Sequence, residues 1–384
     1  MELDMILEKV KTPNEIEGIR LYLKNVWAKK RFSFGTWLNR QHLIMAIDAG
    51  GCTGYAEGII GVNQPEISLE NYQVWSQTLL EQSIDQAIKK VRQNRGKWTE
   101  CFTEMAEMAL LDLGGKINQI SAAEILGLKG TKPVYGVYVI LSDDPEDVSE
   151  KTKWAVAKGK DRFIKVKLFG QNQLDCDIIK MVKKNTKQQT YLIGDVNGGY
   201  CLKDEVVSLE EIAGNLIRLK EAGLDACEDP AYIETEQWVK LQSMVGDLSL
   251  IPDYPLRPAR ESIHQIVPGM GRIYNIHPDS TGSIIDAVAL AEKVRSCGAG
   301  LMIGDDSLVG PAASVWQQLA IGLEAEWVEA TEKEGESDFY YQAVVSIPTD
   351  SRVNPIKTLP CHGFGLYLNE EILTNNTDRR IEIK

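Results

Sequence analysis

From about residue 132 onward, apolar stretches rich in β-branched and aromatic residues alternate with helical patterns. We predict strands over Val134–Leu141, Phe163–Phe169, Tyr191–Val196, Leu224–Glu228, Leu248–Pro252, Ile273–Ile276, Leu301–Gly304 and Trp327–Ala330. Ser208 and Ser283 mark helix starts in the gaps, and Gly223 and Gly298 lie near the expected helix ends. Strands alternating with helices predict a parallel α/β fold, and the number of units is that of a (β/α)8 barrel. A doubly wound open sheet is the alternative, although it rarely contains so many even units.

The first part of the chain has a different pattern. Residues 1–61 predict an antiparallel strand set, in which Leu43–Ile47, the turn Asp48–Gly51 and a return strand over 54–61 form a hairpin. Helices follow over Leu80–Val91, over Phe102–Leu113 with Gly114–Gly115 closing it, and from the capping box Ser121–Glu124. Strands followed by helices predict a small α+β domain.

The tail shows no ninth helical unit. The acidic stretch 332–338 and the strand-like Tyr340–Val345 indicate that the chain leaves the barrel, and Gly363–Leu368 is expected to rejoin the N-terminal domain. We therefore predict three segments: an N-terminal α+β domain over 1–128, a barrel over 129–335, and a returning segment over 336–384.

Composition narrows the class of protein. The hydrophobic fraction of 43% and the charged fraction of 25% are typical of a soluble globular protein. The start MELDMILEKV lacks the basic and apolar regions of a signal peptide, and no apolar run approaches the length needed to span a membrane. The net charge of −13 argues against a nucleic-acid partner. Seven cysteines without a CxxC pair suit reduced thiols, so we expect a cytoplasmic protein.

Polar residues recur where the predicted strands end. They are Lys165 and Lys167, Asp195 and Asn197, Glu228, Asp253, His277, and Asp305 with Asp306. Side chains two apart on a strand face the same way, and the carboxyl ends of parallel strands converge on one mouth of a barrel. Three carboxylates there, Asp195, Glu228 and Asp253, would supply a site for a hard cation such as Mg²⁺. The alternatives are helix caps for the carboxylates and snorkelling surface residues for the two lysines.

The motifs KVK, GDVNGGY, CEDP, IPDYPL and NIHPDSTGS, in this order and spacing, resemble the enolase superfamily, in particular its muconate-lactonizing branch. MALLDLGGKINQISAAEILG resembles the helical part of the family's capping domain, GYAEG its early sheet, and GFGLYLNEEIL its C-terminal return. The resemblance implies a (β/α)8-type, modified TIM barrel with an α+β capping domain formed by the N-terminus and the C-terminal tail.

The resemblance also implies roles for the strand-end residues. Asp195, Glu228 and Asp253 would bind Mg²⁺, or Mn²⁺ as a substitute, and the ion would stabilise the enediolate formed when the α-proton of a substrate carboxylate leaves. Lys167 would be the general base, with Lys165 beside it. A neighbouring ammonium and partial burial both disfavour protonation of a lysine, so they bring its pKa nearer the operating pH.

The sequence departs from the family's pattern at several positions. His277 stands where this branch carries a second lysine; it could be a second base, a neutral hydrogen-bond donor to substrate, or structural. Tyr254 replaces an acidic residue that is common in the family, and Gly282–Ser283 replaces a Gly-Gly pair. Asp306 occupies a region where the branch often holds a substrate-contacting glutamate.

Substrate contacts are expected at Asn197, Asp305, Asp306, Lys30 and Arg31. The stretch Trp27–Thr36 is a candidate lid, in which the two cationic residues could meet a distal carboxylate. Phe32, Phe34 and Trp37 could exclude water. An ordinary surface loop is the alternative.

These observations predict an enzyme that uses Mg²⁺ to remove a proton α to the carboxylate of a small-molecule substrate, as in cycloisomerases, epimerases and racemases. A dehydratase on the same site and a non-catalytic protein that binds metal and carboxylate are the alternatives, followed by a scaffold role. We expect a homo-oligomer with no membrane partner.

Overall fold

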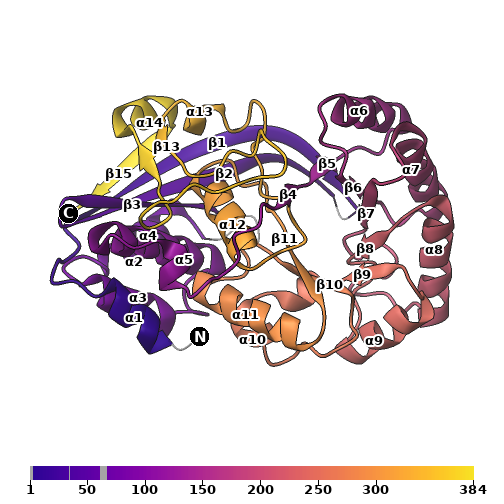
Figure 1. Cartoon of the computed structure of the whole chain (residues 1–384), viewed down its shortest axis with the longest axis horizontal. Helices are drawn as coiled ribbons and strands as arrows, with labels where there is room; N and C mark the ends of the chain where they lie inside the picture. The colour runs from indigo at the N-terminus through magenta and orange to yellow at the C-terminus, as the bar shows by residue number, and fades with distance from the viewer. Residues whose placement is uncertain (1–2, 34, 61–66) are drawn as a thin grey trace.

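The computed structural model of the chain describes residues 3–33, 35–60 and 67–384. An antiparallel sheet with its helices forms one end of the molecule, and parallel strands inside an arc of helices form the other (Figure 1). The long hairpin of β1 (Gly18–Phe32) and β2 (Gly35–Ala49) extends from the first part toward the second. No helix of the described ranges is long and apolar enough to cross a membrane.

The antiparallel sheet has the strand order β15-β1-β2-β3, with β3 over Cys52–Ile60 and β15 over Arg379–Ile383. Ala49 pairs with Cys52 across a two-residue turn. Gly50 and Gly51 there have φ of +55° and +73°, which glycine adopts without the steric cost that a Cβ brings. The predicted hairpin is confirmed as far as Ile60, and residue 61 of the predicted return strand lies outside the described residues.

The helices of this part are α1 (Leu3–Val10), α2 (Leu69–Gln77), α3 (Ile84–Gln93), α4 (Glu100–Asn118) and α5 (Ala122–Ile125). The prediction of strands throughout 1–61 is wrong at its start, because α1 buries Ile6, Leu7 and Val10 at helical spacing. Ser121 caps α5 as predicted, since its side chain accepts a hydrogen bond from the Glu124 backbone N–H.

The prediction that Gly114–Gly115 ends a helix is also wrong. Helix α4 continues through this pair to Asn118. A Cβ built on Gly114 would lie 2.9 Å from Val10 of α1, and one on Gly115 would lie 2.4 Å from the Gly363 backbone. The two glycines therefore serve close packing of the N-terminal helix and of the C-terminal segment on α4.

The parallel strands form two sheets, with the orders β5-β6-β7-β8-β9 and β10-β11-β12-β4. Their bounds are β4 Tyr135–Gly136, β5 Tyr138–Ile140, β6 Phe163–Lys167, β7 Tyr191–Asp195, β8 Ala226–Glu228, β9 Ser249–Ile251, β10 Ile273–Ile276, β11 Gly300–Ile303 and β12 Trp327–Val328. All lie within the predicted strands or extend them by one residue at one end, but the single strand predicted over Val134–Leu141 is two strands, β4 and β5, in different sheets. One apolar cluster joins both sheets and comprises Val137, Ile193, Ala226, Ile251, Met302 and Trp327.

Short links connect the two sheets outside their ladders. The Asn275 N–H donates to the Pro252 carbonyl (3.0 Å), and the Val137 N–H donates to the Val328 carbonyl (2.9 Å). The surrounding helices are α6 (Pro145–Ala157), α7 (Asn172–Asn185), α8 (Leu209–Ala222), α9 (Thr235–Met244), α10 (Ala259–Ser262), α11 (Ile284–Ser296) and α12 (Pro311–Gly322). Ser208 and Ser283 cap α8 and α11 as predicted. The parallel α/β fold is thus confirmed, although no ladder among the described residues closes the sheets into a ring.

The tail contains α13 (Asp338–Tyr341), β13 (Val344–Ser346), β14 (Tyr367–Leu368) and α14 (Glu370–Asn376). The predicted strand over Tyr340–Val345 is wrong at Tyr340 and Tyr341, which belong to α13. Phe364 donates its backbone N–H to Asp112 of α4 (2.8 Å), and β15 pairs with β1. The tail therefore returns to the N-terminal part, and its last strand completes that sheet.

Candidate active site

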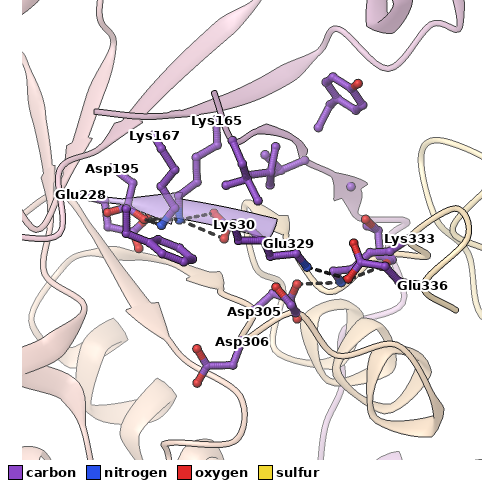
Figure 2. A pocket seen from close by; sticks show the side chains of 18 of the residues that line it. Lys30, Lys165, Lys167, Asp195, Glu228, Asp305, Asp306, Glu329, Lys333 and Glu336 are labelled. Carbon is purple, nitrogen blue, oxygen red and sulfur yellow. Dashed lines mark hydrogen bonds and ion pairs between the residues drawn. The ribbon is translucent and has the colours of Figure 1, made fainter. Parts of the chain in front are cut away.

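The carboxyl ends of the parallel strands open into a cavity of about 1340 Å³. Residues at the ends of both sheets line it together with side chains of the β1–β2 hairpin and of the segment after β12. Figure 2 shows the labelled charged residues around this cavity, with Lys165 and Lys167 extending toward Asp195 and Glu228. The site is thus a charged hollow between the parallel strands and the hairpin of the N-terminal part.

Lys165, on β6, is the centre of a buried ionic cluster. Its Nζ lies 2.8 Å from Glu228 Oε2, 2.9 Å from Glu329 Oε1 and 3.1 Å from Asp195 Oδ2. Burial alone would lower the pKa of this ammonium, but the three carboxylates outweigh burial and raise the pKa well above its ordinary value. Lys165 therefore favours its charged form in this cluster.

Lys167 has different surroundings. It is paired with Asp195, it donates to Asn197 Oδ1 (3.0 Å), and its Nζ lies 5.0 Å from the centre of the Phe32 ring on the hairpin. Its ammonium therefore contacts one carboxylate, whereas that of Lys165 contacts three. Asn197 itself has φ of +47° in the turn after β7, and its backbone carbonyl accepts from the Ser33 hydroxyl (3.2 Å).

The acidic residues at the strand ends are crowded. Burial, and after it the charges of the neighbouring carboxylates, raise the pKa of Glu228 well above its usual range despite the contact with Lys165. Asp195 is also buried, but the two lysine ammonium groups outweigh burial and lower its pKa. Asp253, after β9, is held by Arg257, whose Nε donates to Oδ1 (3.0 Å). Negative charge is thus in excess around Glu228.

His277, after β10, lies in the second sheet. Its Nδ1 is 3.0 Å from the Pro278 carbonyl oxygen and 3.6 Å from Asp306 Oδ2. The Ser280 hydroxyl is 3.2 Å from the same nitrogen and can donate or accept. The carbonyl and the carboxylate are acceptors and favour a proton on Nδ1, and in that tautomer of the neutral ring Nε2 is the basic nitrogen. Burial raises the pKa of Asp306, but His277 when it is protonated, and then Arg257 and Arg40, hold that pKa below its usual range.

The hairpin covers the cavity with alternate residues, since side chains on a strand alternate between its faces. Lys30 is buried and bonds Glu336 (2.7 Å), while burial and then the charge of Lys333 lower its pKa to about 8. Arg31 points to the other face, is half-exposed and pairs with Asp143, so it is not among the cavity-lining residues. Asp305 pairs with Lys333 (2.8 Å). Phe34 lies outside the described residues.

Comparisons with known proteins agree with this architecture. No family model matches the chain. L-Ala-D/L-Glu epimerase of Escherichia coli is 25% identical over 205 residues, which is 52% of this chain and 57% of the epimerase. A dipeptide epimerase from Cytophaga hutchinsonii, solved with Mg and the dipeptide D-Ala-L-Val, superposes with a TM-score of 0.79 at 17% identity, covering 96% of this chain and 100% of that one.

Muconate lactonizing enzyme from Pseudomonas fluorescens, complexed with muconolactone, superposes with a TM-score of 0.76 at 18% identity, over 96% of this chain and 100% of that chain. The chain has the fold of the enolase superfamily. The resemblance seen in the motifs is therefore confirmed at the level of the fold, across nearly the whole chain.

Within this enolase-superfamily fold, Asp195, Glu228 and Asp253 have the donor chemistry that suits Mg²⁺, because all three offer carboxylate oxygens. Asn275 Nδ2 donates to Glu228 Oε1 (3.1 Å), whereas its Oδ1 is buried without a hydrogen-bond partner. The unpartnered oxygen of Asn275 and the crowded carboxylates around Glu228 together favour binding of a cation at this position. In the part of the chain that the structure describes, no three such side chains are arranged as a finished metal cage.

The structure adds residues to this site that the strand-end pattern did not reveal. Glu329 directly follows β12, and the rule used for the other strands could have found it. Arg257 lies one helical turn beyond Asp253 and becomes important only through that contact. Arg40 enters the cavity lining from β2, and nothing in the local sequence marks it.

Proposed function

We propose that the chain is a Mg²⁺-dependent enzyme that removes the proton α to the carboxylate of a small-molecule substrate. The observation that carries the proposal is that Lys167 and His277 end strands of different sheets and line the same cavity, beside crowded carboxylates. An acid–base group on each side of a substrate allows a proton to be removed from one face and returned to the other. The enolase-superfamily fold supports the same class of chemistry.

Asp195, Glu228 and Asp253 would hold the ion, which would supply positive charge to the substrate carboxylate as the α-proton leaves. Lys167 Nζ, once neutral, would take that proton, and the adjacent Phe32 ring would limit access of water. Lys165 would remain protonated and offset negative charge beside it. Nε2 of His277 would accept or return a proton on the other face.

We further infer that the two parallel sheets are halves of one (β/α)8 barrel, with segments near 1–128 and 336–384 as its cap. With two bases the reaction would be epimerisation or racemisation, and with Lys167 alone it would be cycloisomerisation. Dehydration of a hydroxy acid is the alternative on the same residues. Cytoplasmic location, Mn²⁺ as a substitute, and homo-oligomeric assembly stay predictions.

The proposal is tested by exchange of the α-proton in D₂O, measured by NMR on a panel of carboxylates with Mg²⁺. Lys167→Ala should abolish exchange on every substrate that the wild type accepts. Lys184→Ala, on the outer surface of α7, is the matched control and should leave exchange unchanged. Normal exchange by Lys167→Ala would refute the assignment of the base.

His277→Asn separates the reactions. If both residues act as bases, this variant should exchange the proton of one enantiomer only, because Lys167 still serves its own face of the substrate. If His277→Asn still exchanges the α-proton of both enantiomers, His277 acts only in binding. That outcome would favour a single-base reaction.

A non-catalytic carboxylate-binding protein is a second candidate, favoured by one contact. Arg257 holds Asp253 through both carboxylate oxygens, so this metal position is already neutralised by the chain itself. Calorimetry with Mg²⁺ on the wild type, Asp195→Asn and Glu228→Gln distinguishes the candidates. Binding by the wild type that both variants lose supports the enzyme, and absence of binding with added carboxylates supports the second candidate.

A further inference from the structure

The turn that follows β10 orients the ring of His277. The Pro278 carbonyl and the Ser280 hydroxyl of this turn lie 3.0 and 3.2 Å from Nδ1 of the ring. The His277 carbonyl accepts from the Thr281 backbone N–H (3.0 Å) and from its hydroxyl (2.8 Å). Asp279, within the turn, has φ of +67°, a conformation that a residue other than glycine keeps only where neighbouring contacts hold it. The position of the ring therefore depends on what holds the turn.

The contacts that hold the turn come from the N-terminal part of the chain. Glu104 of α4 accepts the Asp279 backbone N–H at Oε1 (2.8 Å) and the Gly282 backbone N–H at Oε2 (3.1 Å). The Thr103 hydroxyl, beside it on α4, donates to the Gly282 carbonyl (2.7 Å). The Asp279 side chain accepts the Ile59 backbone N–H of β3 (3.1 Å). A helix and a strand of the N-terminal part thus fix a turn that belongs to the parallel strands.

A carboxyl group is an unfavourable residue for this buried position. Glu104 is 2% exposed, and burial, followed by the charge of Asp279, raises the pKa of its carboxyl well above the usual range. Among the described residues its oxygens accept bonds only from uncharged donors, namely the two N–H groups of the turn and the Trp316 ring N–H of α12 (3.2 Å). An apolar side chain would fill the space without this cost, but it would bind neither N–H group. Glu104 therefore fixes the turn as well as filling space.

We propose that Glu104 is a positioning residue of the active site, which sets the place of the His277 ring in the cavity by holding the turn after β10. This inference rests on the proposed function for the role of His277 as the base on one face of the substrate. Lys167 ends β6 in the other sheet and has contacts of its own, at the end of β7 and with the hairpin. Loss of Glu104 should therefore affect one face of the substrate and spare the other.

Exchange of the α-proton in D₂O, measured by NMR on each enantiomer of an accepted substrate with Mg²⁺, tests the proposal. Glu104→Ala should slow exchange of the enantiomer that depends on His277 by about tenfold to a hundredfold, since a small displacement of a reacting group costs this much. Exchange of the other enantiomer should stay near the wild-type rate. Glu104→Gln, whose amide nitrogen cannot accept an N–H, should lie between the wild type and Glu104→Ala.

Glu107→Gln is the matched control. Glu107 lies one turn further along α4, is also buried, and accepts the Ser283 hydroxyl (2.7 Å) and the Ile285 backbone N–H (2.9 Å). These contacts are at the start of α11, beyond the turn that holds His277. Glu107→Gln should therefore lower the stability of the protein without changing the ratio of the two exchange rates.

The ring-nitrogen NMR signals of His277 give a second readout, which needs no reaction. The chain has four histidines, and the signals of His277 are those missing from His277→Asn. Glu104→Ala and Glu104→Gln should shift these signals, because movement of the turn changes the surroundings of Nδ1. Glu107→Gln should leave them at their wild-type positions.

Equal slowing of both enantiomers by the Glu104 variants, or His277 signals that neither variant shifts, would overturn the role of Glu104. If Glu104→Ala is unfolded by circular dichroism, Glu104→Gln decides in its place. The proposed function is judged separately. A wild type that exchanges no carboxylate would refute the reaction, and exchange of both enantiomers by His277→Asn would refute the second base. In either case the His277 signals alone decide whether Glu104 positions the ring.

Discussion

Replacing Lys165 by methionine removes the ammonium that three buried carboxylates share. The side chain of Lys165 is only 4% exposed, and the carboxylate oxygens of Asp195, Glu228 and Glu329 lie 2.8–3.1 Å from its Nζ. Breaking a buried ion pair by removing one partner typically costs about 3–5 kcal/mol, because the other charge stays buried and unpaired. We expect Lys165→Met to lose stability of this order at pH 8 without Mg²⁺.

The loss should depend on pH with a defined sign. Without the ammonium, the buried carboxylates have pKa values raised further above those of the unfolded chain, and Glu228 is already raised in the wild type. A raised carboxylate pKa contributes stability that is present below the unfolded pKa and is lost as pH rises through the folded one. The difference between wild type and variant should therefore be smaller at pH 5.5 than at pH 8.

Urea denaturation followed by circular dichroism measures these differences at both pH values, with and without Mg²⁺. Lys167→Met is the matched control, because its ammonium contacts only one carboxylate, Asp195, and it should lose less. If the carboxylates bind Mg²⁺, the ion should restore part of the stability of Lys165→Met. Equal stability of Lys165→Met and wild type at pH 8, or a loss independent of pH, would refute the reasoning.

Further predictions concern contacts around the site. Burial, and then the charge of Asp306, raise the pKa of Asp279 to about 7, so its contribution to stability is present below about pH 4 and is lost as pH rises through about 7. The unfolding free energy of Asp279→Asn should therefore fall less between pH 6 and pH 8 than that of the wild type. Urea titrations at both pH values measure this fall, and an equal fall in the two proteins would contradict the prediction. Arg257→Met should free Asp253 and strengthen Mg²⁺ binding in calorimetry, and weaker binding would show instead that the arginine orients that carboxylate. Glu57 accepts the backbone N–H groups of Val309 and Gly310 at the start of α12 (2.9 and 2.7 Å), so Glu57→Gln should lower the unfolding free energy by about 1–3 kcal/mol. Stability equal to the wild type would mean that the amide replaces both bonds.

Local pattern was sufficient for the parallel strands and for the polar residues that end them. Each apolar run is long enough for one buried strand. The first polar residue after the run lies at the strand's carboxyl end because it is the next residue in the chain. Lys165, Asp195, Glu228 and His277 were therefore placed at one mouth from the sequence, and the structure brings them to one cavity. Local pattern was insufficient where packing overrides propensity, as in α4, which crosses Gly114–Gly115 because neighbouring chain segments approach there.

The sequence by itself determined the α/β class, the order of the strands and the chemical types available at their ends, because these depend on periodicity and on residues adjacent in the chain. Only the tertiary structure decided which of those groups are paired. Lys165 gains three carboxylates from three other strands, Asp253 is engaged by Arg257, and Arg40 enters the cavity from a hairpin distant in sequence. Charge compensation is a property of groups within a few ångströms in space, and for this site those groups are 4 to 306 residues apart along the chain.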